Sequence, residues 1–407
     1  MTFITRSVTC TVVLIISGCL LWYSVCTFRA ATKDVAFVQT ASSRFFPETL
    51  LIDGKIKYYS TLDPLAAAES YKNAILAEPS LLDAWMAMAQ AEIAMGRRGE
   101  AERIFGIIAP TLSSISSWKW EELLLAFDLQ DEEHFRHCFN YILSNLPHRI
   151  REASRLGAWY WGGWENVLPR LSSSNYPVFF TQVMAAGEVD AALALWEKME
   201  AENSGITEKD SLQFCQFLIT HDRLREAKNI WKIWKGDDFS NITDGGFESQ
   251  PLNTAFGWHI SSNPDVIIER TPDQPYAGKA CLHLHFKGTT NISLSSIYQI
   301  VPVEPETRYE LRFTRKSRDI TTDCGVFIEI SGYKCKGLSI SSQPILGASP
   351  WAEEEMEFVT PAGCEAVLLR VCRKESLKFD NKISGDYWLD SVELVHRRGA
   401  EHAEEGN

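Results

Sequence analysis

The amino-acid sequence predicts an α + β multidomain chain: an N-terminal transmembrane helix, an α-solenoid of helix pairs, and a C-terminal antiparallel β-sandwich. Three observations support this class. The run from Val8 to Phe28 carries no charge. After Asp63 the apolar residues follow a helical period, with a repeat of 34 residues. After the segment Asp244-Gly245-Gly246-Phe247-Glu248 the apolar period falls to two, which is typical of strands.

Length and charge limit the class of partner. The chain has 407 residues and a formal net charge of −13, and this length accommodates two or three domains. Nucleic acids are bound by dense groups of Lys and Arg, which the sequence lacks. We therefore expect no nucleic-acid partner.

Residues 1–29 are predicted to contact the membrane. The uncharged run is long enough to cross a bilayer as a helix, so we expect a single-pass protein of the bacterial inner membrane with its soluble part in the periplasm. The alternative is a lipoprotein anchored at Cys19, because Ile16-Ser17-Gly18-Cys19 is similar to a lipobox. The apolar run continues past Cys19, which favours the transmembrane anchor. Residues 30–60 lack a sustained period and are interpreted as a linker.

Residues 61–236 are predicted to form the solenoid. Ala67 and Tyr71 recur 34 residues later as Ala101 and Phe105. The small residue allows two helices to cross closely, and the aromatic residue fills the gap to the next pair. This pattern resembles the tetratricopeptide-repeat family. The resemblance implies a stacked helical surface that binds a protein partner.

Two groups in this solenoid carry competing interpretations. Trp159, Trp161 and Trp164 are either core residues or a recognition patch, and the burial typical of Trp favours the core. His134 and His137 lie three residues apart, as metal ligands on one helical face would, but the surrounding charges favour a solvated face.

Residues 239–396 are predicted to form one antiparallel β-sandwich, and residues 397–407 a disordered tail. Short alternating segments are separated by Gly, Pro and Asn turns. The alternation assigns these residues to the inside of the sandwich: Leu282, Leu284, Phe286, Tyr309, Leu311, Phe313, Val326, Ile328, Ile330, Val367, Leu369 and Val371.

Several short motifs in this half occur in a characteristic order. After the Gly-Gly-Phe-Glu start come Trp258, a Gly-Lys-Ala-Cys-Leu strand, Tyr-Gln-Ile-Val-Pro-Val, Tyr-Glu-Leu-Arg-Phe and a closing Tyr-Trp-Leu-Asp-Ser-Val-Glu-Leu. Together they resemble the jelly-roll carbohydrate-binding modules of the galactose-binding-like superfamily. The resemblance implies a structural calcium held by Glu248 and Asp390. The alternative is that these two carboxylates only cap turns.

The same resemblance implies a glycan-binding face built from outward alternates of the strands. The candidates are His283, His285, Arg312, Phe327, Glu329 and Arg370. His283 and His285 also have a metal-ligand spacing, but without a third ligand we interpret them as two exposed histidines. The sandwich holds an odd set of cysteines, so a bridge such as Cys324 to Cys335 leaves at least one thiol free.

The sequence contains no phosphate loop, nucleophile elbow, zinc-protease motif or dinucleotide fingerprint, so we expect no enzyme. The repeats, the sandwich and the anchor together resemble accessory proteins of bacterial exopolysaccharide assembly and export. The predicted function is a membrane-tethered, non-catalytic adaptor that binds a protein through its repeats and a polysaccharide through its sandwich. The alternatives are a purely structural scaffold without a sugar ligand and a cryptic polysaccharide-degrading subunit.

Overall fold

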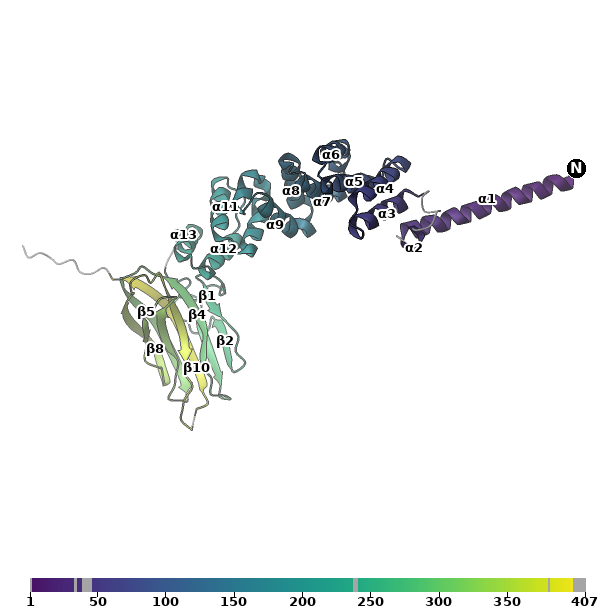
Figure 1. Ribbon diagram of the computed structural model, residues 1–407. Helices are drawn as coiled ribbons and strands as arrows, with labels where there is room; N and C mark the ends of the chain where they lie inside the picture. Colours follow the sequence, from purple (N-terminus) through teal and green to yellow (C-terminus); the bar gives the residue numbers. More distant parts are fainter. Residues whose placement is uncertain (1, 33–34, 39–45, 237–240, 380, 398–407) are drawn as a thin grey trace, which may run out of the picture. The chain divides into compact units, whose positions relative to one another are not determined.

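The structure is a computed structural model that describes residues 2–32, 35–38, 46–236, 241–379 and 381–397. Helices come first along the chain and strands second (Figure 1). The predicted helical region followed by an antiparallel β-sandwich is confirmed. The chain divides into two compact units, Met1–Ser204 and Gly205–Asn407. Apart from Arg397, the predicted tail lies outside the described residues, as does the predicted start of the sandwich at residue 239.

The prediction of a transmembrane helix is wrong. Helix α1 runs from Thr2 to Ala31, and its described side chains extend from Ile15 to Arg29. Within the described part of the chain, no helix combines the length and apolarity needed to cross a membrane. A crossing needs about 20 apolar residues in one helix. The predicted single-pass location in the bacterial inner membrane depends on that helix and is therefore wrong as well.

The rest of the first unit consists of helices that pack against their neighbours along the chain. The α-helices are α2 (Val35–Val38), α3 (Pro47–Tyr59), α4 (Pro64–Ala77), α5 (Leu82–Ala94), α6 (Arg98–Ser113), α7 (Lys119–Asp128), α8 (Glu132–Asn145), α9 (Ile150–Tyr160), α10 (Tyr176–Ala186) and α11 (Val189–Ala201). The short 3₁₀ helices are η2 (Ser116–Trp118), η3 (Pro147–Arg149), η4 (Glu165–Arg170) and η5 (Ser173–Asn175). Helix α3 lies inside the segment that the sequence suggested as a linker.

Local sequence explains where these helices begin and why they pack closely. Asp63 caps α4, because its carboxylate accepts the backbone N–H of Ala66, and Pro64 occupies the first turn. Ala67, Ala74 and Ala101 are fully buried, as expected where two helices approach at short distance. The 34-residue offset therefore marks buried contact positions, while the assignment to the tetratricopeptide family stays a prediction.

The tryptophans of the first unit do not all lie in its core. Trp161 packs edge-on against Phe135 and Phe139, and Trp164 contacts Phe179. Trp159, in contrast, is 70% exposed and stacks on Phe127 at 4.7 Å between ring centroids. Trp161 and Trp164 are thus partly buried against core phenylalanines, whereas Trp159 is exposed.

The second unit contains two helices, α12 (Glu208–Thr220) and α13 (Leu224–Lys235), followed by the sandwich. Its strands are β1 (Trp258–Ile260), β2 (Val266–Thr271), β3 (Cys281–Lys287), β4 (Leu294–Pro302), β5 (Arg308–Ile320), β6 (Phe327–Gly332), β7 (Ser339–Ser341), β8 (Gly347–Val359), β9 (Ala366–Arg373) and β10 (Ser384–His396). They form two five-stranded sheets in the orders β1-β4-β9-β6-β7 and β2-β3-β10-β5-β8.

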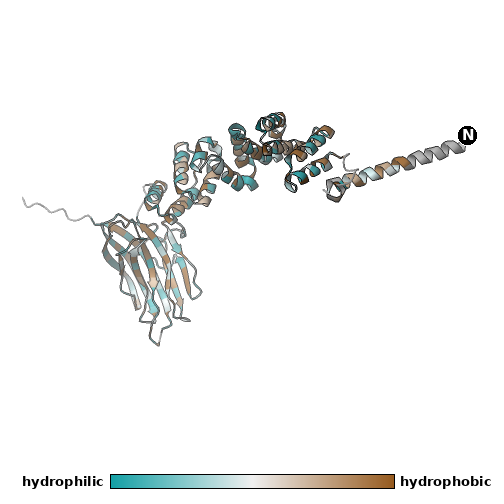
Figure 2. Cartoon of the chain, viewed as in Figure 1, coloured by the Kyte–Doolittle hydropathy of each residue, from teal (hydrophilic) through white to brown (hydrophobic). Residues whose placement is uncertain are grey.

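The core of the sandwich lies between the two sheets. The predicted inward residues of β3, β5, β6 and β9 all belong to one buried apolar cluster. Hydrophobic and hydrophilic residues follow each other closely along the strands, as a two-residue period requires (Figure 2). Burial of one side of each sheet therefore determines which side chains lie on the opposite side.

Helices α12 and α13 belong with the sandwich because they make polar and aromatic contacts to its loops. The Gln216 carboxamide oxygen accepts the Ala255 N–H at 2.7 Å, and Arg225 pairs with Glu365 at 2.5 Å. Trp231 meets Phe256 edge-on. These contacts explain why the compact unit begins at Gly205, before both helices.

One disulfide joins two loops of the sandwich. Cys335 pairs with Cys364, whereas Cys324 is a free thiol. The bridge differs from the suggested Cys324–Cys335 pair because the turn after β6 lies beside the turn before β9, through the antiparallel pairing of these strands.

We predict that replacing both cysteines by alanine lowers the free energy of unfolding of the sandwich by about 3 kcal/mol, because the bridge closes a loop of 29 residues that is otherwise free in the unfolded chain. Calorimetry of the full chain, with and without the substitutions, measures the effect. Cys324→Ser is the matched control and should leave the transition unchanged. A double variant as stable as the natural chain would contradict the prediction.

Candidate functional site

The predicted glycan-face residues lie on two opposite faces of the sandwich. Phe327, Glu329 and Arg370 point outward from sheet β1-β4-β9-β6-β7, whose outer surface we call the β4 face. The other three candidates, on β3 and β5, point outward from the second sheet, whose outer surface we call the β3 face. The structure thus does not bring the six residues together, and one ligand cannot contact them all.

A row of planar side chains crosses the β4 face. The antiparallel register places His259 beside Tyr298, Tyr298 beside Arg370, and Arg370 beside Glu329. The rings of His259 and Tyr298 stack at 4.7 Å with an interplanar angle of 1°. Arg370 Nη2 donates to Glu329 Oε1 at 2.5 Å and to the Ser331 hydroxyl at 3.1 Å. An aromatic platform therefore lies directly beside an ion pair.

The β4 face is partly enclosed. Ile300, Phe327 and Cys372 point away from the core cluster, yet they are only 5%, 7% and 5% exposed. The Nε atom of Arg370 is buried and has no hydrogen-bond partner among the described residues. A buried donor without a partner costs about 1–3 kcal/mol. This surface therefore has buried apolar side chains and a buried hydrogen-bond donor beneath it.

Sequence reasoning did not single out His259 and Tyr298 as site residues. Tyr298 belongs to the Tyr-Gln-Ile-Val-Pro-Val motif, and His259 follows Trp258. The alternation of β4 places Tyr298 outward, which is a signal available from sequence. The stack with His259 depends on the pairing of β1 with β4, which no local pattern specifies.

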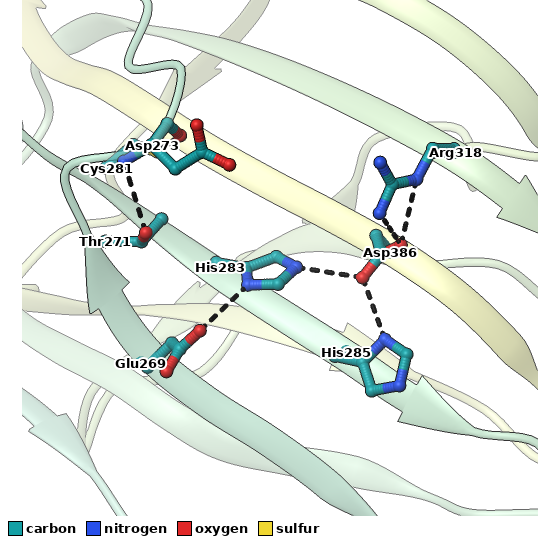
Figure 3. Close-up of polar contacts among 8 residues, drawn as sticks. All are labelled: Glu269, Thr271, Asp273, Cys281, His283, His285, Arg318 and Asp386. Atoms are coloured by element: carbon teal, nitrogen blue, oxygen red, sulfur yellow. Dashed lines mark hydrogen bonds and ion pairs between the residues drawn. The ribbon is translucent and has the colours of Figure 1, made fainter.

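The β3 face is organised around one buried carboxylate, Asp386, which is 6% exposed. Its Oδ1 accepts hydrogen bonds from His283 Nε2 at 2.9 Å and from His285 Nδ1 at 2.8 Å (Figure 3). Its Oδ2 accepts two from Arg318, at 3.1 and 2.6 Å. The other ring nitrogen of His283 faces Glu269 at 3.3 Å. The two histidines are therefore members of a connected network.

This network sets the charge of Asp386 and covers the neighbouring Trp388. Burial alone raises the pKa of Asp386, but hydrogen bonds from Arg318, His285 and His283 outweigh it, so the pKa lies below its ordinary value. His283 stacks on Trp388, which is only 5% exposed. The indole is therefore not free to stack on a ligand.

Arg312 stands apart from this network. Its Nε contacts Glu310 at 2.5 Å and Glu355 at 3.3 Å. Arg312 lies six residues along β5 from Arg318, and Glu355 comes from the neighbouring strand β8. Arg312 is thus part of a surface ion-pair group of its own.

The predicted calcium ligands, Glu248 and Asp390, lie close together. A Cβ atom at Gly246 would lie 3.9 Å from both Glu248 Oε1 and Asp390 Oδ1, so glycine keeps this space open. Asp390 Oδ2 accepts the N–H groups of Tyr276 and Ala277 at 2.8 and 3.1 Å. The Val392 N–H donates to the Gly245 carbonyl oxygen at 2.9 Å, which joins the opening segment to the closing strand.

The chemistry of this pair fits a hard cation. Burial raises the pKa of Asp390, backbone hydrogen bonds oppose that rise, and the charge of Glu248 adds to it. Neither carboxylate forms an ion pair with a described residue. Two carboxylates alone do not complete a calcium shell, and the described residues hold no group of three metal-binding side chains. Carbonyl oxygens or water would have to supply the other ligands. The carboxylate of Asp244 accepts the N–H groups of Glu248 and Ser249 and shapes the turn.

Comparison with protein-family models and with curated proteins found no match. Among solved structures, β-sandwiches match the C-terminal region. The enzymatically active domain of tailspike protein 4 of bacteriophage CBA120 has 15% identity and a TM-score of 0.31, covering 39% of this chain and 21% of that chain. A family 16 carbohydrate-binding module has 18% identity and a TM-score of 0.28, covering 38% and 99%. A family 61 carbohydrate-binding module in complex with β-1,4-galactotriose has 14% identity and a TM-score of 0.29, covering 39% and 99%.

We predict that Asp386→Asn destabilises the sandwich by about 1–3 kcal/mol at pH 7, because four N–H donors from three side chains lose a charged acceptor. The depressed pKa in the folded state means that this contribution is complete above the unfolded aspartate value of about 3.9 and is lost as the pH falls through the lower folded value. Urea unfolding between pH 7 and pH 3 measures it. Glu357→Gln, at an exposed position, serves as control. A difference in unfolding free energy between Asp386→Asn and the natural chain that grows as the pH falls would refute the assignment.

Proposed function

We propose that the sandwich binds a polysaccharide chain on the β4 face. The observation that carries this proposal is the row formed by the His259–Tyr298 stack and the Arg370–Glu329 pair. A sugar ring has an apolar face that packs on an aromatic ring, and hydroxyl groups that bridge planar polar side chains. Binding pockets in general combine an apolar wall with a few placed polar groups.

The β3 face is less suited to this role. Its large aromatic side chain, Trp388, is covered by His283, and the ammonium of Lys316 lies over the ring at 5.0 Å. Its polar groups are engaged with Asp386. On the β4 face, by contrast, the stacked rings of His259 and Tyr298 are only partly buried. We therefore place the ligand beside Phe327, Glu329 and Arg370, and not beside His283, His285 and Arg312.

The helical repeats supply the second half of the proposed function. We infer that the first unit binds a protein partner and that the chain is a non-catalytic adaptor in exopolysaccharide assembly or export. Support comes from the buried 34-residue pattern, which stacks helices into an extended surface, and from the exposed Trp159. Aromatic side chains of this kind often dominate binding energy at protein interfaces.

We also propose that a structural calcium ion lies between Glu248 and Asp390, with the glycine at position 246 leaving room for it. The ion would neutralise two adjacent carboxylates and connect the opening segment to the closing strand. Its role would be stability, not chemistry at the β4 face.

We predict that Tyr298→Ala and Arg370→Gln each weaken polysaccharide binding about tenfold, equivalent to about 1.4 kcal/mol. One variant removes the platform and the other removes the hydrogen-bonding fork. Affinity gel electrophoresis of the full chain against a panel of purified bacterial exopolysaccharides measures binding. Circular dichroism confirms that both variants fold.

Arg312→Gln provides the matched control, because it removes the same charge on the opposite face. Equal losses in Arg312→Gln and Arg370→Gln would contradict placement on the β4 face. If the natural chain binds no polysaccharide but captures a protein through its helices, a purely structural scaffold is favoured instead. Shortening of the polysaccharide would point to a degrading subunit.

For the calcium ion we predict that Ca²⁺ at a hundredfold excess over its dissociation constant stabilises the sandwich by about 2.7 kcal/mol. Mg²⁺ should not replace it, since Mg²⁺ demands a tighter octahedral shell. Thermal unfolding with Ca²⁺, with Mg²⁺ or with a chelator measures the effect. Glu248→Gln keeps the acceptor for the Lys279 N–H, so it should fold and lose the response. An unchanged response in this variant would exclude the site.

A further inference from the structure

Strand β2 is an edge strand of the sandwich, and its outer edge is open at Ile268. The Lys287 N–H donates to the Asp265 carbonyl oxygen, in register with the antiparallel pairing of β2 and β3. Because hydrogen bonding alternates along such a pair, the odd-numbered residues of β2 bond to β3. The even-numbered residues, Ile268 among them, present their N–H and C=O groups to the open edge. Within the described part of the chain, these groups of Ile268 have no hydrogen-bond partner.

The open part of this edge is short and apolar. At one end, Asn263 forms an isolated bridge with Val266. At the other end, the Arg270 guanidinium donates to the carbonyl oxygens of Phe247 and Glu248 and so fixes the opening segment beside β2. Pairing with a further strand is therefore centred on Ile268.

The other edge strands of the sandwich are protected against such pairing. Strands β1 and β7 are three residues long. Strand β8 is longer, but it carries Glu353, Glu354, Glu355 and Glu357. Short strands and rows of charged side chains both disfavour the addition of a strand. The edge of β2 thus differs from the other three.

A cavity of about 320 Å³ lies beside this open edge, between β1 and β2 (Figure 1). Its floor is apolar, because Phe247, Trp258 and Leu282 belong to the core cluster between the two sheets. Ile260 of β1 and Ile268 of β2 form its walls and are only partly buried. The cavity therefore connects the hydrophobic core to the edge and has room for one large apolar side chain.

The open edge and the cavity meet at the same residue. Directly opposite residues of paired strands place their side chains on the same face. A peptide residue paired with Ile268 would exchange backbone hydrogen bonds with it and direct its own side chain toward the cavity that Ile268 lines. One extended segment can thus use both features at once.

We propose that this edge binds an extended segment of a partner protein, which pairs with β2 and fills the cavity with one large apolar side chain. Strand addition of this kind takes its affinity from the backbone and its specificity from side-chain pockets. A second copy of β2 is less suited, because its inward side chains already pack against its own core. The site is separate from the β4 face and from the helical surface, so it goes beyond the proposed function.

The test is fluorescence polarisation of the full chain with the fluorescein-labelled peptide Thr-Thr-Thr-Phe-Thr-Thr-Thr, whose β-branched residues favour an extended backbone. Replacing the central Phe by Ala should weaken binding about tenfold, because the cavity loses its apolar occupant. N-methylation of the Phe should weaken binding about five- to tenfold, because it removes the donor to the Ile268 carbonyl oxygen. N-methylation of the next Thr is the matched control, since that N–H points away from β2.

Variants of the chain test the same contact from the other side. Ile268→Phe should weaken peptide binding about tenfold, because the added ring occupies the cavity. Ile267→Phe is the matched control, since Ile267 is 45% exposed on the opposite face of the same strand. Circular dichroism confirms that both variants fold.

The proposal is overturned if the natural chain does not bind the peptide, or if Ile268→Phe and Ile267→Phe bind it equally well. Equal losses for the two N-methylated peptides would contradict pairing with β2. A dimer of the natural chain that the peptide dissociates in sedimentation would assign the edge to a second copy instead. Polysaccharide binding is measured separately through Tyr298→Ala and Arg370→Gln, so its failure leaves this inference in place.

Discussion

Burial of one side of each sheet is the constraint on which the sandwich depends. Because side chains alternate along a strand, the apolar cluster between the sheets leaves the other residues on the two outer faces. The antiparallel register then determines which of them meet. On the β4 face it brings His259, Tyr298, Arg370 and Glu329 into one row. On the β3 face it places His285 and Arg318 on either side of Asp386.

The alternation within each strand could be read from the sequence, and the pairing between strands could not. The predicted inward residues of β3, β5, β6 and β9 are buried for this reason. The six predicted face residues were separated because sheet order is non-local: β6 pairs with β9, whereas β3 pairs with β10 about a hundred residues later. Asp386, the centre of the histidine network, comes from that distant strand. The resemblance did predict that Glu248 and Asp390 lie near each other, as they do on either side of Gly246.

The helical region shows the same division between local and non-local information. Small and aromatic residues at an offset of 34 marked buried contact positions, since close helix packing selects them locally. The exposure of Trp159 could not be predicted in this way, because it depends on which helices lie beside α9. The two units also differ from the division suggested by composition. Helices α12 and α13 belong with the sandwich through contacts such as Gln216 to Ala255, which no helical period reveals.

The central claim is that a polysaccharide lies across the β4 face, and amide hydrogen exchange of the full chain tests it most directly. With saturating polysaccharide, we expect slower exchange in β4, β9 and β6, which carry Tyr298, Arg370, Phe327 and Glu329. Strands β3 and β10 should exchange as they do without ligand. Protection confined to β3 and β10, or none in either sheet under conditions where binding is measured, would contradict the claim.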